Sequence, residues 1–161
     1  MNIAPKVKLK FNNKPWKQIE RRLTRGGRYT VRVGFFDGMY PDGISVPQVA
    51  AWNEEGHFTG WGGYSPPRPF IRLGFMGDVK KGKFLNKYIR MVSQIAEGRM
   101  TWRSLNLAMS KELIEIMKTN ILDWDNPSNS PTTISVKGFN DPLIHTGKMY
   151  DRVKAKVIKK G

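Results

Sequence analysis

Three short segments with strict two-residue alternation constrain this chain more than any other feature of its sequence. In each segment, hydrophobic side chains fall on one face of an extended strand and polar side chains, mostly Lys or Arg, fall on the other. The segments cover residues 6–11, 28–36 and 152–157. Because this pattern recurs near both ends of the chain and in an early segment, we expect a small, mainly antiparallel sheet that contains all three.

The polar face of this predicted sheet is strongly cationic. It carries Lys6, Lys8, Lys10, Arg28, Arg32, Arg152, Lys154 and Lys156. Like charges directly across neighbouring strands destabilise a sheet, so such a face favours an anionic partner. The alternative interpretation is a solvated face whose long side chains spread apart in water. The sequence leaves both interpretations open.

Helices are predicted between the strands, over residues 15–25, 45–56, 84–97 and 101–122. In the second helix, Ser45 and Gln48 have capping-box spacing, and Gly56 suits a left-handed C-terminal residue. The fourth helix has an apolar face wider than one sheet requires, so it is either the central core helix or shared with a neighbouring subunit. Residues 125–142 are typical of turns. The predicted class is α+β, with a small sheet packed against two or three helices in a single domain, residues 1–161.

A long loop rich in Gly and Pro is predicted between the second and third helices. Residues 57–69 contain three glycines and three prolines, too many for regular structure. The same residues include three aromatic side chains, Phe58, Trp61 and Tyr64. Long loops with exposed aromatic rings are usually functional or ordered by a partner. Alternatively, the rings fold back onto the core of their own domain.

Composition limits the classes of function. The chain has 28 Lys and Arg against 13 Asp and Glu, a formal charge of +15, which favours acidic partners and nucleic acid first. It has no cysteine, which excludes disulfides and cysteine-ligated metals. No apolar stretch approaches the roughly 18 residues of a membrane span, and the first residues lack the apolar region of a signal peptide. We therefore expect a cytosolic protein, or one assembled into a particle built in the cytosol.

The chain shows no pattern typical of an active site. His57 and His145 are the only histidines, and neither has a metal-ligand companion three or four residues away. Asp123 and Asp125 leave a magnesium-dependent nuclease as a weaker alternative, since nuclease metal sites use such acids. Sequence patterns of serine hydrolases, P-loops and dinucleotide-binding loops are missing. We expect no enzymatic activity, no bound metal and no cofactor.

Several fragments, taken in order, resemble one family. The run Val-Ala-Ala-Trp-Asn-Glu-Glu-Gly at residues 49–56 is followed, after the loop, by Pro-Pro-Arg-Pro-Phe-Ile-Arg at residues 66–72. Later come Ser-Pro-Thr-Thr-Ile at 130–134, Lys-Gly at 137–138 and Pro-Leu-Ile-His-Thr-Gly-Lys-Met at 142–149. Together they resemble the neck and tail-completion, or tail-terminator, proteins of tailed bacteriophages of the HK97 minor-tail type. The likeness spans residues 28 to 158. It departs at Glu55, where the family usually has an aromatic residue, and at His145, where it usually has Asp.

The resemblance implies a role in virion structure. Family members are α+β subunits that assemble as a ring, commonly sixfold, and join the head connector to the tail. The implied partners are further copies of the chain, the connector or adaptor and the tail-tube or sheath proteins, with genomic DNA in the lumen as an optional partner bound without sequence specificity. The implied location is the neck or tail of a virion assembled in the host cytoplasm, with no membrane contact. The resemblance implies no enzymatic activity.

The region around the loop is our candidate for the subunit contact or the neck-to-tail contact. Its candidate residues are Trp52, Asn53, Glu54, Phe58, Trp61, Tyr64, Pro67, Arg68, Pro69 and Phe70. The prolines stiffen the segment and hold Arg68 and Phe70 at low entropic cost, and Arg68 can pair with Glu54 or Glu55. The alternative is that the motif anchors the loop to its own core. For the whole chain, the alternative function is a basic nucleic-acid-binding protein without sequence specificity.

Overall fold

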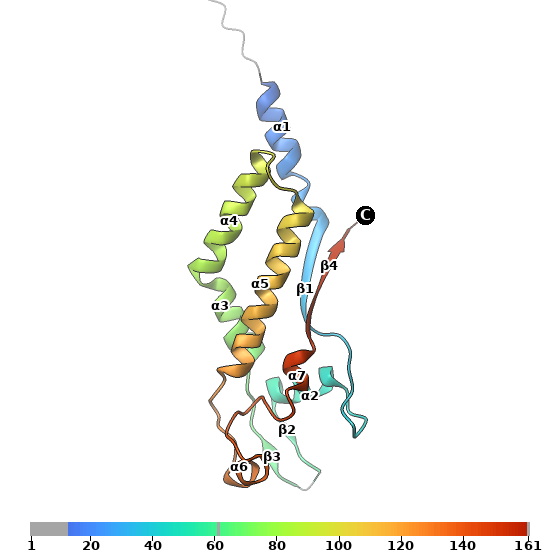
Figure 1. The fold of residues 1–161 in the computed structure, drawn as a ribbon, viewed down its shortest axis with the longest axis vertical. Coiled ribbons are helices and arrows are strands. Elements are labelled where there is room, and N and C mark those ends of the chain that lie inside the picture. The colour runs from blue at the N-terminus through green and yellow to red at the C-terminus, as the bar shows by residue number, and fades with distance from the viewer. Residues whose placement is uncertain (1–12, 61, 161) are drawn as a thin grey trace, which may run out of the picture.

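The computed structural model describes residues 13–60 and 62–160 (Figure 1). The molecule is elongated, and its longest helix, α5 (Trp102–Leu122), runs along the long axis. Helix α1 (Lys14–Leu23) lies at one end, and the hairpin of β2 (His57–Phe58) and β3 (Tyr64–Ser65) lies at the other. A small antiparallel sheet packs against helices, which confirms the predicted α+β class.

The main sheet joins β1 (Tyr29–Phe35) to β4 (Val153–Lys159) in antiparallel register, with Val33 opposite Ala155. Two of the three alternating segments are therefore confirmed as strands. The third, residues 6–11, lies outside the described residues, as do its three lysines. Alternation places six side chains on the face that α5 covers: Val31, Val33, Phe35, Val153, Ala155 and Val157. This face of the sheet forms one wall of the hydrophobic core.

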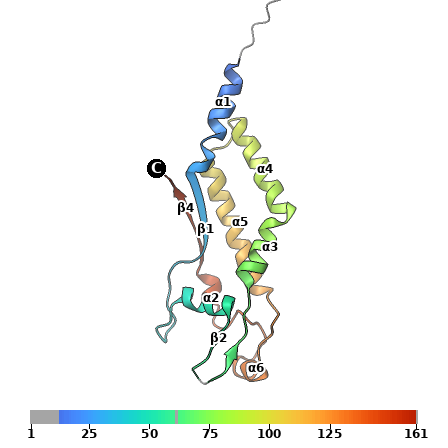
Figure 2. The same ribbon diagram turned by 180° about the vertical axis from the view of Figure 1, so that it is seen from behind.

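Helix α5 lies between the sheet and α4 (Gly82–Ala96), as both views show (Figures 1 and 2). On the sheet side its Met117 and Ile121 join a core that also includes Phe70. On the other side its Leu105 and Met109 pack with Ile95 of α4. The wide apolar face of this helix is therefore used on two sides within one chain, so α5 is the central core helix.

Side-chain caps explain where two helices begin. The Ser45 hydroxyl accepts a hydrogen bond from the backbone N–H of Gln48 at the start of α2 (Val46–Glu55), and Gly56 follows its last turn with φ of 76°. The Thr101 hydroxyl accepts from the N–H of Ser104 at the start of α5. Each cap satisfies an N–H group that has no partner within the helix. The predicted helix boundaries are confirmed here.

Several short elements were not expected from the sequence. A π-helix (Phe70–Phe75) leads into α3 (Met76–Lys80), and a single turn, α7 (Lys148–Asp151), precedes β4. The prediction of turns throughout 125–142 is wrong in part, because Pro131–Lys137 form α6 behind a Ser130 cap. The loop over 57–69 is also not wholly irregular, since β2 pairs with β3. A short 3-10 turn, Gly26–Arg28, connects α1 to β1.

Candidate functional site

Glu54 and Phe70 fix the segment that we expected to meet a partner. Glu54 is 8% exposed, and its carboxylate accepts hydrogen bonds from the backbone N–H groups of Ile71 and Arg72, each at 2.9 Å. These bonds tie the end of α2 to the start of the π-helix. Phe70 is fully buried, and its ring meets Phe35 edge-on with centroids 6.2 Å apart. Both side chains hold the segment to the core of their own chain.

Arg68 connects the hairpin to the loop after α5. Its side chain is 6% exposed, and its guanidinium donates to the carbonyl oxygens of Pro127 (3.1 Å) and Ser128 (3.4 Å) and to the hydroxyl of Ser65 (3.3 Å). Burial lowers the pKa of Arg68, because removing the guanidinium from water penalises its charged form. Arg68 thus joins parts of the chain that are 59 residues apart in sequence.

These contacts correct two of the predictions. Arg68 does not pair with Glu54 or Glu55 within the chain: Glu54 binds backbone N–H groups, and Glu55 pairs with Arg72 at 3.8 Å. Arg68 and Phe70 are also buried, so they position the segment instead of facing a partner. For these residues the alternative interpretation, an anchor to the chain's own core, describes what the structure shows.

The hairpin presents two aromatic rings to solvent. Phe58 is 80% exposed and Tyr64 is 55% exposed, although their rings lie against each other with centroids 5.2 Å apart. The N–H of Thr59 donates to the carbonyl of Gly63 at 2.7 Å and closes the turn. Trp61, the third aromatic of the predicted contact, lies outside the described residues. Phe58 and Tyr64 thus form an exposed aromatic pair on the described part of the hairpin.

The remaining predicted contact residues support the hairpin. Trp52 stacks on His57 with ring centroids 5.0 Å apart, and the carbonyl of Asn53 accepts from the N–H of Arg68 at 2.6 Å. Pro67 is exposed and Pro69 half-buried. Gly56 is required here for two reasons. Its φ is positive, and an added Cβ would lie 2.7 Å from the Tyr64 hydroxyl.

A polar cleft of about 710 Å³ lies between the hairpin and the start of α6. Its wall includes Arg68 and six hydroxyl side chains: Thr59, Ser65, Ser128, Ser130, Thr132 and Thr133. Two buried nitrogens, His57 Nδ1 and Asn129 Nδ2, have no hydrogen-bond partner among the described residues. Unsatisfied buried polar atoms are uncommon, so these nitrogens are unusual features beside the cleft wall.

The predicted cationic face is partly neutralised. Arg152 and Lys154 both contact Asp37, at 3.4 and 2.8 Å, and the hydrogen bond from Lys154 is the largest cause that lowers the pKa of Asp37. Lys156 lies over the Phe36 ring, 4.4 Å from its centroid. Of the five predicted cations that fall within the described residues, Arg28 and Arg32 have no such partner.

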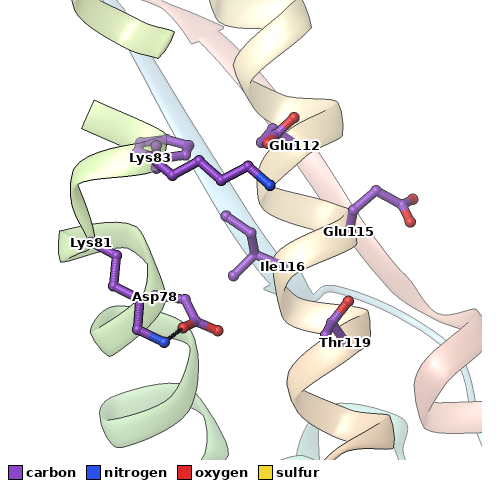
Figure 3. Close-up of a pocket in the computed structure, with 8 residues that line it drawn as sticks. Asp78, Lys81, Lys83, Glu112, Glu115, Ile116 and Thr119 are labelled. Carbon is purple, nitrogen blue, oxygen red and sulfur yellow. Dashed lines mark hydrogen bonds and ion pairs between the residues drawn. The ribbon is translucent and has the colours of Figure 1, made fainter. Parts of the chain in front are cut away.

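A cleft of about 270 Å³ between α3, the start of α4 and α5 gathers carboxylates (Figure 3). Lys81 and Asn120 both bind Asp78 and lower its pKa, the Lys81 hydrogen bond most strongly. Lys87 pairs with Glu112, and Figure 3 shows Lys83 extending from α4 toward α5. Across residues 13–60 and 62–160, no three His, Asp or Glu side chains form a group that could hold a metal ion. Asn120 thus joins α5 to α3 through Asp78, and Glu112 joins α5 to α4 through Lys87.

Comparison with models of protein families, with curated proteins and with solved structures finds no significant match to this chain. Within the part of the chain that the structure describes, none of the helices combines the length and hydropathy needed to span a bilayer.

Proposed function

We propose that this chain is a structural subunit of a tailed-phage neck, of the tail-completion type, and that its hairpin contacts another subunit or a neighbouring neck protein. One observation carries the proposal: two exposed aromatic rings, Phe58 and Tyr64, stand on a platform fixed by buried Glu54 and Arg68. Aromatic anchors dominate many protein interfaces, and a rigid platform lowers the entropy lost on binding.

The positions of the family-like fragments support this proposal. The fragment at 49–56 supplies the end of α2, and the fragment at 66–72 supplies Arg68 and the start of the π-helix. Hydrogen bonds from Arg68 to residues 127–129 bring it next to α6, which the fragment at 130–134 begins. Fragments that are far apart in sequence thus build one end of the molecule (Figure 1).

The proposed subunit assembles as a ring, and the net charge of the chain sets a condition on that assembly. Six copies would carry 6 × 15 = +90 formal charges, and such self-repulsion disfavours a compact assembly unless anionic partners neutralise it. Acidic connector or tail proteins and DNA in the lumen are the two available sources of negative charge. The proposal assigns the chain no enzymatic activity.

A pair of double variants tests the hairpin contact. Phe58→Ala/Tyr64→Ala removes the exposed aromatic pair, whereas Trp16→Ala/Tyr88→Ala removes two exposed aromatic side chains from α1 and α4. In sedimentation velocity we expect the wild-type chain and the second variant to assemble and the hairpin variant to remain monomeric. Assembly of the hairpin variant at the wild-type concentration, or equal disruption by both variants, would contradict the proposed contact.

The alternative function is a monomeric nucleic-acid-binding protein without sequence specificity. A monomer with strong, salt-sensitive affinity for DNA would favour this alternative over a ring-forming subunit.

A further inference from the structure

A second cleft, of about 460 Å³, lies where the end of α1, the start of β1 and the start of α5 meet. Five cationic side chains line it: Arg22, Arg25, Arg28, Arg103 and Lys159. Its other lining residues are Tyr29, Ile95, Gly98, Met100, Thr101 and Trp102, so no acidic side chain lines it. Both views place this junction toward the end of the molecule opposite the hairpin (Figures 1 and 2).

The floor of this cleft is held by specific contacts. Arg22 donates from Nη1 to the carbonyl of Ala96 at 2.9 Å, and its guanidinium lies against Gly98, where an added Cβ would be 2.8 Å from Cζ. The indole N–H of Trp102 donates to the carbonyl of Arg22 at 2.6 Å. Gly26 lies so close to the Trp102 ring that a Cβ there would be 2.6 Å from it. These contacts fix α1 against the start of α5.

The cations on the walls are not neutralised by the chain itself. Among the described residues, the side chains of Arg25, Arg28, Arg103 and Lys159 form no ion pair or hydrogen bond. Elsewhere cations form ion pairs: Arg72 pairs with Glu55, and Arg152 and Lys154 pair with Asp37. Like charges held together repel one another, and a bound polyanion removes that repulsion.

We propose that this cleft binds the phosphodiester backbone of nucleic acid without reading its sequence. Four of its five cations are arginines, whose planar guanidinium groups match the geometry of phosphate oxygens. The lining has no Asn, Gln, Asp or Glu, so the side chains that pair with adenine or cytosine edges are absent from it. Tyr29 and Trp102 add aromatic surface, which favours a nucleic acid over an acidic peptide.

Further exposed cations lie on the elements that form this junction. Arg21 is exposed in the last turn of α1, and Arg32 lies on the face of β1 away from α5. Lys160 follows β4, and its backbone N–H bonds to the carbonyl of Arg28. Because the cleft and the hairpin lie at opposite ends, this proposal does not rest on the proposed hairpin contact.

Matched variants with equal charge test the cleft. Arg25→Ala/Arg28→Ala/Arg103→Ala removes three exposed wall cations, and Lys80→Ala/Arg90→Ala/Lys111→Ala removes three exposed cations elsewhere. Each variant has a net charge of 15 − 3 = +12. Fluorescence anisotropy measures the binding of a short labelled single-stranded DNA between about 50 and 200 mM salt, with polyglutamate as a second anionic probe. Circular dichroism checks that each variant is folded.

We expect wild-type binding to weaken steeply with salt. The cleft variant should lose at least about tenfold in affinity at the lowest salt, with a salt slope shallower by about 2 to 3, while the control stays within about threefold of wild type. Arg25→Gln/Arg28→Gln/Arg103→Gln should repeat the loss. Absence of wild-type binding, equal loss in the control, or polyglutamate binding that is tighter and equally sensitive to the cleft substitutions would overturn the proposal.

Discussion

Two neighbouring glutamates at the end of α2 show how position decides the role of one residue type. Glu54 is buried and accepts two backbone N–H groups, whereas Glu55 is exposed and pairs with Arg72 at the surface. Hydrogen bonds to a buried charged acceptor stabilise far more than an exposed ion pair does. The stability of the hairpin platform therefore depends on Glu54.

Replacing each glutamate by Gln separates the two roles. Glu54→Gln puts an NH₂ group against one of two N–H donors, so we expect the free energy of unfolding to fall by about 1–3 kcal/mol. Glu55→Gln is the matched control and should change it by less than about 0.5 kcal/mol. Denaturant titration of both variants measures the difference. Equal effects from the two substitutions would show that the Glu54 bonds do not hold the platform.

The sequence identifies important residues in this region. It does not show whether their side chains point into the core or toward solvent. Glu54, Arg68 and Phe70 all belong to the family-like fragments and all have structural roles. However, a segment with three prolines has no helical or strand periodicity from which to assign an inner face. Arg68 is buried by residues 127–129, and such a distant contact leaves no local signal near residue 68.

Whole elements were predictable where periodicity and caps agreed. Ser45 and Thr101 begin α2 and α5 as expected, and the alternating segments form β1 and β4. Helix α6 was missed because it is seven residues long and rich in Thr, Ile and Val, which favour strands. The π-helix and α3 are also too short for a periodic pattern to be evident.

At the element scale, acid should weaken the junction of α3 with α5. Lys81 and Asn120 lower the pKa of Asp78 below its unfolded value of about 3.9. The stabilisation is therefore present above about pH 4 and is lost as the pH falls through the folded-state pKa. We expect Asp78→Asn to lower the free energy of unfolding at pH 7 by about 1 kcal/mol. In acid, the difference in free energy of unfolding between this variant and wild type should become smaller.

Denaturant titrations at a series of pH values measure this difference in free energy of unfolding. Lys81→Gln leaves Asp78 with Asn120 as a partner and should show part of the effect. If the difference between Asp78→Asn and wild type stays constant or grows as the pH falls, the ion pair and hydrogen bond of Asp78 do not stabilise the junction.

At the scale of the whole molecule, α5 separates two surfaces of different chemistry. The β2–β3 hairpin lies at one end, and the junction of α1, β1 and α5 lies toward the other (Figure 1). The hairpin carries the exposed aromatic pair, and the junction carries the cationic cleft. A subunit that assembles around a polyanion needs both kinds of surface, one for a protein neighbour and one for negative charge. The net charge of +15 alone does not reveal this division, because it sums over faces that only the fold separates.

Electron microscopy of the purified wild-type chain can show whether it forms rings. We predict closed rings, commonly sixfold, in class averages of negatively stained particles. A population that remains monomeric at every concentration tested would contradict the proposed role as a ring-forming neck subunit.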